Sequence, residues 1–242
     1  DFRDDMSEEE QNFLIVLISE AKIFTVICNA LLGGNQLEAY AVKFFLQDAK
    51  DAIERSGEST GNADALWAQW LVANGEWAFA QQKYASAERF FTEAKHKARL
   101  AGHKLWAQIS ILNLAHALIK SGKTNQALHL LQNSLEDGFA LETAYYEAKW
   151  DLAYCTFLEG QTEEATRILQ CMDEELQERP ELNTWHALAL QPLGMILCET
   201  GDAATGKETL LKAQSLWTTV NGSENQQKRI ADWPSFRAGH GL

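Results

Sequence analysis

Histidine and cysteine are the first residues to consider for chemistry in this chain, because both bind metals and take part in catalysis. The 4 cysteines are scattered singly and form no CxxC pair. The chain also lacks a phosphate-binding glycine loop, a nucleophile elbow and an HExxH zinc motif. We therefore expect no enzyme, metal or cofactor. We expect ordinary surface or packing roles for the six histidines, which are His96, His103, His116, His129, His186 and His240.

Three aromatic residues could instead form contacts with another protein. Trp150, Tyr154 and Phe157 lie 4 and 3 residues apart, so they share one face of a helix. Large aromatic side chains often anchor peptide and protein contacts. The alternative is that these three residues only pack against neighbouring helices.

The charge of the chain argues against two classes of partner. A formal net charge of −13 repels nucleic-acid backbones and anionic membrane surfaces. The same charge could equally serve only to keep the protein soluble. Isolated cysteines in apolar helical contexts are typical of small core residues in a reduced compartment, so we expect a cytoplasmic protein.

One apolar segment, residues 13–32, is about as long as a bilayer span. Glu20 and Lys22 lie near its middle, and a charge there costs roughly 2.5–3.5 kcal/mol on insertion. The segment therefore favours a helix that is buried against protein. A helix that is apolar over most of its circumference must be covered on several sides. It could pack back on the rest of the chain or pair with a second copy through Phe13, Leu17, Phe24, Ile27 and Leu31.

A pattern of small and large apolar residues recurs along the chain. In the first copy, Gly75 is followed at spacings of 9, 12, 16 and 19 by Tyr84, Ala87, Phe91 and Ala94. Three further copies follow the same frame. They contain Ala115, Gly122, Ala127, Leu131 and Ser134, then Ala153, Gly160, Ala165, Leu169 and Met172, and then Gly194, Gly201, Gly206, Leu210 and Ala213.

This frame resembles the tetratricopeptide repeat, in which two antiparallel helices form each copy. The resemblance covers residues 64–220 well and 8–55 loosely. It implies an all-α fold, a right-handed superhelical array of antiparallel helix pairs with a concave inner face. Successive copies are 40, 38 and 41 residues apart, longer than the usual period of about 34, so the helices should be longer. Gly206 stands where the family has Ala, a departure that costs about 1 kcal/mol inside a helix.

The sequence predicts three regions. Residues 1–60 form an N-terminal helix pair, with helices at about 8–32 and 36–55, which is a degenerate repeat or a capping or dimerisation element. Residues 61–220 hold four helix pairs, in which Gly122, Gly160 and Gly201 end first helices. Residues 221–242 form a polar tail.

The resemblance implies a function as well as a fold. In the family, the first helix of each pair lines the concave face. On that frame the partner-binding residues are Gln69, Glu76, Phe79, His116, Lys120, Glu147, Trp150, Tyr154, Phe157, Gln191 and Met195. These residues are mostly acidic, apolar or aromatic, which favours an apolar or basic peptide, or a partner helix, over a carboxylate clamp.

Two functional hypotheses remain open. The first is a protein-interaction scaffold or adaptor. The second is a ligand- or partner-sensing module cut from a larger signalling or transcription-regulating protein. Repeats near 40 residues are similar to those of multidomain bacterial regulators, and the chain begins at Asp1 rather than methionine. A longer reading frame with an ATPase or DNA-binding domain would favour the second.

Overall fold

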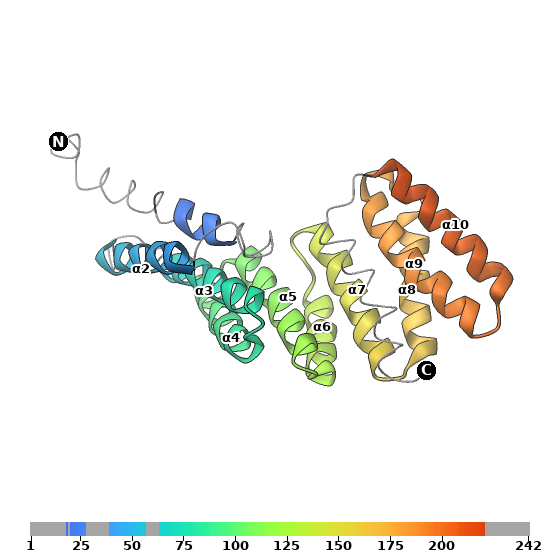
Figure 1. Cartoon of the computed structure of the whole chain (residues 1–242), viewed down its shortest axis with the longest axis horizontal. Helices are drawn as coiled ribbons and strands as arrows, with labels where there is room; N and C mark the ends of the chain where they lie inside the picture. The colour runs from blue at the N-terminus through green and yellow to red at the C-terminus, as the bar shows by residue number, and fades with distance from the viewer. Residues whose placement is uncertain (1–17, 19, 28–38, 57–62, 221–242) are drawn as a thin grey trace. The chain divides into compact units, whose positions relative to one another are not determined.

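The structure is a computed structural model of the 242-residue chain, and it describes residues 18, 20–27, 39–56 and 63–220. All regular secondary structure in these ranges is helical (Figure 1). The predicted all-α class is therefore confirmed for this part of the chain. Among the described helices, none combines the length and the apolar character needed to cross a membrane.

The chain divides into two compact units, residues 1–123 and 124–242. The first unit contains a helical segment at 20–27, then α2 (Ala39–Ser56), α3 (Ala63–Ala80), α4 (Tyr84–Leu100) and α5 (Lys104–Lys120). The second contains α6 (Thr124–Asp137), α7 (Glu142–Leu158), α8 (Thr162–Leu176), the short 3₁₀ turn η1 (Pro180–Leu182), α9 (Asn183–Glu199) and α10 (Ala203–Thr219). The predicted four pairs at 61–220 correspond to α3 to α10, and the division between units falls within the second predicted pair.

Within each unit, a helix packs mainly against the helix before and the helix after it in the chain. In the first unit α3 packs on α4 and α4 on α5, and α3 also contacts α5. In the second unit α7, α8, α9 and α10 pack in succession, and α7 also contacts α9. Contact between alternate helices is what stacked helix pairs require. The packing of consecutive helices in each unit is thus consistent with a helical repeat.

First and second helices of a pair bury their residues differently. In α4 the buried residues form one stripe, Ala87, Phe91, Ala94 and Ala98, which is the pattern of a helix with one face in solvent. In α9 six consecutive residues, 185–190, are buried, so this helix is covered on all sides. The first helices therefore lie inside the packing and the second helices cover them.

The small residues of the repeat frame lie where helices approach closely. A Cβ added at Gly75 in α3 would come within 2.4 Å of the Phe91 ring in α4. At Gly206 in α10, an added Cβ would lie 2.7 Å from the backbone nitrogen of Cys198 and 2.8 Å from the carbonyl oxygen of Gly194. The predicted penalty for glycine at 206 is therefore offset by contact, because the backbones of α9 and α10 leave no room for the methyl group of Ala.

One turn geometry joins most of the helices. After α5, Gly122 has a φ of +72°, its N–H donates to the carbonyl of Ile119, and the N–H of Lys123 donates to the carbonyl of Leu118. This pattern is the Schellman motif, which needs a residue in the left-handed region. Gly160 and Gly201, the other glycines predicted to end first helices, also have positive φ. After α3 the same position is occupied by Gln82, with a φ of 59°.

Polar contacts tie one turn to the next along the chain. Glu88 near the start of α4 accepts hydrogen bonds from Ser121 at 2.6 Å and Lys123 at 2.7 Å, both in the turn after α5. In the second unit, Thr124 at the start of α6 donates to Glu159 after α7. Each contact spans 33 to 35 residues, so the turn regions of successive pairs are joined at similar places.

Candidate functional site

The first unit carries five of the predicted partner-binding residues, on α3 and α5. Gln69, Glu76, Phe79 and His116 are half-buried, and Lys120 is exposed. Because α3 and α5 contact each other, the two helices form one face of the unit. The Phe79 ring lies edge-on to Tyr84, with 5.3 Å between ring centroids, which fixes the end of α3 against the start of α4.

The N-terminal helical segment lies against this face at Gln69. The Gln69 amide donates to the carboxylate of Glu20 at 3.4 Å. Ile23 and Val26 of the same segment are buried with Val42 and Leu46 of α2. The segment therefore packs back on its own chain, which is one of the two alternatives predicted for it, and it restricts access to the Gln69 end of α3.

The aromatic residues of α7 are largely inside the second unit. Trp150 is 3% exposed and Tyr154 is 8% exposed, and their rings stack with 5.7 Å between centroids. The indole N–H of Trp150 donates to the backbone carbonyl of Leu188 in α9 at 2.9 Å. These two residues lie in the packing arrangement that the sequence analysis left as the alternative to partner binding. Glu147 and Phe157 on the same helix are half-buried.

The Trp150 hydrogen bond has a cause in the sequence of α9. In a helix, the carbonyl of Leu188 would accept from the N–H of residue 192, four positions later. Residue 192 is Pro192, which lies inside α9 and has no N–H. The Leu188 carbonyl thus loses its intrahelical donor, and Trp150 supplies a replacement from the neighbouring helix. Sequence reasoning did not single out Pro192.

The remaining predicted residues of the second unit, Gln191 and Met195, are half-buried on α9. The Gln191 side-chain oxygen accepts a hydrogen bond from the indole of Trp217 in α10 at 3.2 Å. Trp217 is itself half-buried. Part of the Gln191 side chain is therefore used to hold α10 on α9.

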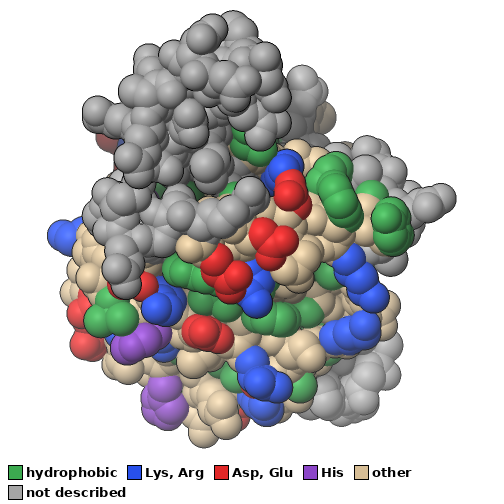
Figure 2. Space-filling model, turned by 90° about the vertical axis from the view of Figure 1, so that its left-hand side faces the viewer, with side chains coloured by type: hydrophobic (Ala, Val, Ile, Leu, Met, Phe, Trp, Pro, Cys, Tyr) green, Lys and Arg blue, Asp and Glu red, His purple; other side chains and the backbone are tan. Residues whose placement is uncertain are grey.

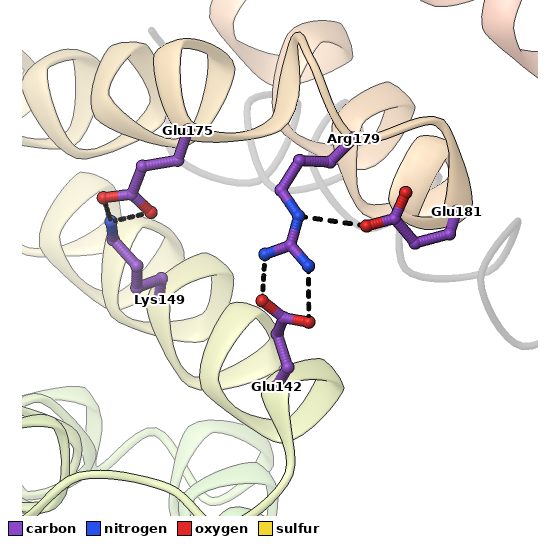
Figure 3. Close-up of polar contacts among 5 residues, drawn as sticks. All are labelled: Glu142, Lys149, Glu175, Arg179 and Glu181. Atoms are coloured by element: carbon purple, nitrogen blue, oxygen red, sulfur yellow. Dashed lines mark hydrogen bonds and ion pairs between the residues drawn. The ribbon is translucent and has the colours of Figure 1, made fainter.

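Ion pairs fix α7 against α8 and the η1 turn (Figure 3). Arg179 binds both carboxylate oxygens of Glu142 and also reaches Glu181 at 3.0 Å, while Lys149 donates to Glu175 at 2.8 and 2.9 Å. Hydrogen bonding from Arg179 lowers the pKa of Glu142. Burial works to lower the pKa of Lys149, but the hydrogen bond and charge of Glu175 outweigh it and the pKa is raised.

A polar cluster that the sequence analysis missed joins three helices of the second unit. His186 of α9 is 3% exposed, and its Nε2 lies 2.6 Å from Oδ1 of Asp173 in α8. Lys212 of α10 donates to the same oxygen at 2.7 Å. These hydrogen bonds, His186 first, lower the pKa of Asp173 despite its partial burial. The only signal in the sequence was a histidine inside an apolar run, and its partners lie 13 and 26 residues away.

Cys155 of α7 behaves as the core residue that the sequence predicts. It is fully buried, and burial, followed by the charge of Asp151, raises the pKa of its thiol far above the ordinary value. The thiol is therefore held in its unreactive protonated form. Asp151 is also buried, at 2% exposure, and was not predicted.

The predicted dimer residues fall partly outside the described chain. Phe13, Leu17 and Leu31 lie in residues that the structure does not describe, as does the predicted tail at 221–242. Phe24 is 65% exposed. Ile27 is half-buried and packs against the core clusters of the first unit.

Comparison with known proteins adds no identification to this geometry. No protein-family model matches the sequence, and a search of curated proteins finds no significant match. The likeness to tetratricopeptide repeats therefore rests on the recurring residue frame.

Proposed function

We propose that the chain is a protein-interaction module. It binds a peptide or a partner helix on the face of α3 and α5 in the first unit. The partner carries basic and large apolar side chains, because α3 presents the Glu76 carboxylate and the Phe79 ring one turn apart.

The observation that carries the proposal is the mixed character of α3 and α5. Helices that lie inside a packing are expected to be largely apolar, and α3 is on average as apolar as α9. Yet α3 keeps Glu76 and Phe79 half-exposed one turn apart, and α5 adds His116 and Lys120. A carboxylate near a half-exposed aromatic ring suits a peptide that pairs a cation with an apolar residue.

The test uses peptides selected from a random library on the full chain. We expect the selected peptides to be rich in Lys or Arg and in large apolar residues. Glu76→Lys should raise their Kd at least tenfold, because it places like charges in contact. The measurement is isothermal titration calorimetry with one selected peptide, together with the thermal midpoint of each variant to show that folding is kept.

Glu93→Lys is the matched control. Glu93 is exposed on α4, the covering helix of the same unit, and the substitution makes the same change in net charge. Its Kd should stay within twofold of the parent chain. Selected peptides without basic residues, or equal loss of affinity in both variants, would refute the proposed face.

A further inference from the structure

The outer face of α2 is unusual for a helix face that meets solvent. Its residues opposite the core include Tyr40 and Phe44, which are 77% and 55% exposed. The last described helix of the second unit, α10, exposes mainly polar side chains, with Leu211 as its large apolar exception. Terminal helices of repeat proteins need a polar outer face for solubility. The α10 helix meets this criterion, whereas the outer face of α2 stays partly apolar even though the segment 20–27 also packs on α2.

The exposed stripe on α2 has a definite order of side chains. Apart from Lys43 and Phe44, which are adjacent, its members follow one another at spacings of three and four, so all of them share one face of the helix. From the start to the end of the helix, they are Tyr40, Lys43, Phe44, Gln47, Asp51 and Glu54. The first half is aromatic and basic and the second half is acidic. Figure 2 views the molecule from the side on which α2 lies and shows exposed hydrophobic side chains beside acidic and basic ones.

This order is complementary to itself in one orientation. If two copies of α2 run antiparallel about a two-fold axis at Gln47, Lys43 of each copy faces Asp51 of the other. Tyr40 then faces Glu54, and its hydroxyl can donate to that carboxylate. A parallel arrangement would place Lys43 against Lys43 and Asp51 against Asp51, which is repulsive. An isologous contact of this kind is the commonest basis of homodimers.

The groups needed for the contact are already held in place. Gln47 donates to Asp51 at 2.6 Å within the helix, and Lys50 lies 3.6 Å from Glu54. Val42, Leu46, Ala49 and Ile53 anchor the opposite side of α2 in the core of the unit. The stripe is therefore preorganised, so association loses less side-chain freedom.

We propose that two copies of this chain associate through the outer face of α2, antiparallel and with Gln47 at the two-fold axis. This inference does not depend on the peptide site, which lies on α3 and α5. It places the contact on α2 rather than on the segment before residue 32.

The first test is the mass of the full chain by sedimentation over a range of concentrations. The parent chain should form a dimer, and Phe44→Ala should raise its dissociation constant at least tenfold. Leu211→Ala, which removes an apolar side chain at an exposed position of α10, should leave the dimer unchanged. A parent chain that is monomeric up to millimolar concentration, as when its own residues cover the stripe, would overturn the proposal. Equal dimerisation of the two variants would also overturn it.

The second test addresses the antiparallel register. Lys43→Glu and Asp51→Lys should each weaken the dimer, because each creates like-charge contacts. The double variant should recover most of the affinity, because each new glutamate then faces a new lysine.

A crosslinking experiment tests the same register. Gln47→Cys should form an intermolecular disulfide on mild oxidation, more readily than the parent chain or Gln214→Cys on α10. Failure of the double variant to recover, or equal crosslinking at 47 and 214, would exclude this register.

Discussion

At the scale of single residues, Trp150 supplies a hydrogen-bond donor to a carbonyl of a neighbouring helix. Its indole N–H binds the Leu188 carbonyl, whose usual donor is missing at Pro192. Trp70 in the first unit makes a similar contact with the Leu46 carbonyl at 2.8 Å, where no proline is involved. A buried carbonyl left without a donor costs about 1–3 kcal/mol, so Trp150 carries a stabilising role whatever else it contacts.

The dependence of Trp150 on Pro192 can be measured by a double-mutant cycle. Trp150→Phe should lower the free energy of unfolding by about 1–3 kcal/mol. In a Pro192→Ala background the residue at 192 regains an N–H that can bind the Leu188 carbonyl, so the same substitution should cost about 1 kcal/mol less. Denaturant unfolding followed by circular dichroism gives all four values.

Trp70→Phe is the control for that cycle, because its carbonyl partner lies in α2. Trp70→Phe should change the free energy of unfolding by the same amount in the parent chain and in the Pro192→Ala background. If Trp150→Phe costs the same in both backgrounds, the link between Pro192 and Trp150 is wrong.

The Asp173 cluster predicts a pH dependence of stability. The folded-state pKa of Asp173 is lowered, chiefly by the hydrogen bond with His186. A lowered carboxylate pKa contributes stability above the unfolded-state value near 3.9, and that contribution is lost as pH falls through the folded-state value. Asp173→Asn should therefore lower the free energy of unfolding by about 1–3 kcal/mol at pH 7. The difference in unfolding free energy between the parent chain and Asp173→Asn should narrow below about pH 4.

Glu174→Gln is the matched control, since Glu174 is exposed beside Asp173 on α8. Its unfolding free energy should follow the parent chain across the pH range. If the unfolding free energy of Asp173→Asn differs from that of the parent chain by the same amount from pH 7 to pH 3, the charge of this carboxylate does not contribute to stability.

At the scale of elements, two turns between helices share one backbone geometry but differ in the residue that occupies the left-handed region. The turn after α5 uses Gly122 in the left-handed region, whereas the turn after α3 uses Gln82 in the same region. Both turns have the same pair of backbone hydrogen bonds. After α3, the N–H of Gln82 donates to the carbonyl of Phe79 and the N–H of Lys83 donates to the carbonyl of Ala78. A residue with a side chain pays roughly 1–2 kcal/mol for that conformation, and glycine does not.

Gln82→Gly should accordingly raise the free energy of unfolding by about 0.5–1 kcal/mol, since the relief of strain exceeds the added freedom of the unfolded chain. Gly122→Ala should lower it by about 1 kcal/mol. Thermal unfolding by calorimetry compares the two. Gln81→Gly, one residue earlier in the turn, should not stabilise. Stabilisation of equal size at 81 and 82 would mean that backbone conformation is not the cause.

At the scale of the whole molecule, the sequence predicts the class of fold and the identity of the paired helices. The buried stripe of a covering helix follows from the spacing of residues within that helix. Accordingly, the frame residues Ala87, Ala127 and Ala165 are all fully buried. Gly206 was correctly placed in the frame, but its close contact with Cys198 depends on the separation of two helices. The spacing of residues along the sequence does not give the distance between two packed helices.

The candidate site was less predictable than the fold. Spacing places Trp150 and Tyr154 on one face of a helix, but it does not say whether that face meets solvent or another helix. The burial of Trp150 depends on α9, which begins 33 residues later in the chain. The division of the chain after Lys123 was not predicted either, since the turn at Gly122 matches the turns inside each unit.

Packing between chain neighbours has a consequence for how each unit forms. Because most helix contacts within a unit join consecutive helices, few distant segments must meet before a stable nucleus exists. Low contact order of this kind is associated with folding in microseconds to milliseconds rather than seconds. Newly made chain emerging from a ribosome could close its first helix pairs before the second unit is synthesised, so little apolar surface would stand exposed at any one time.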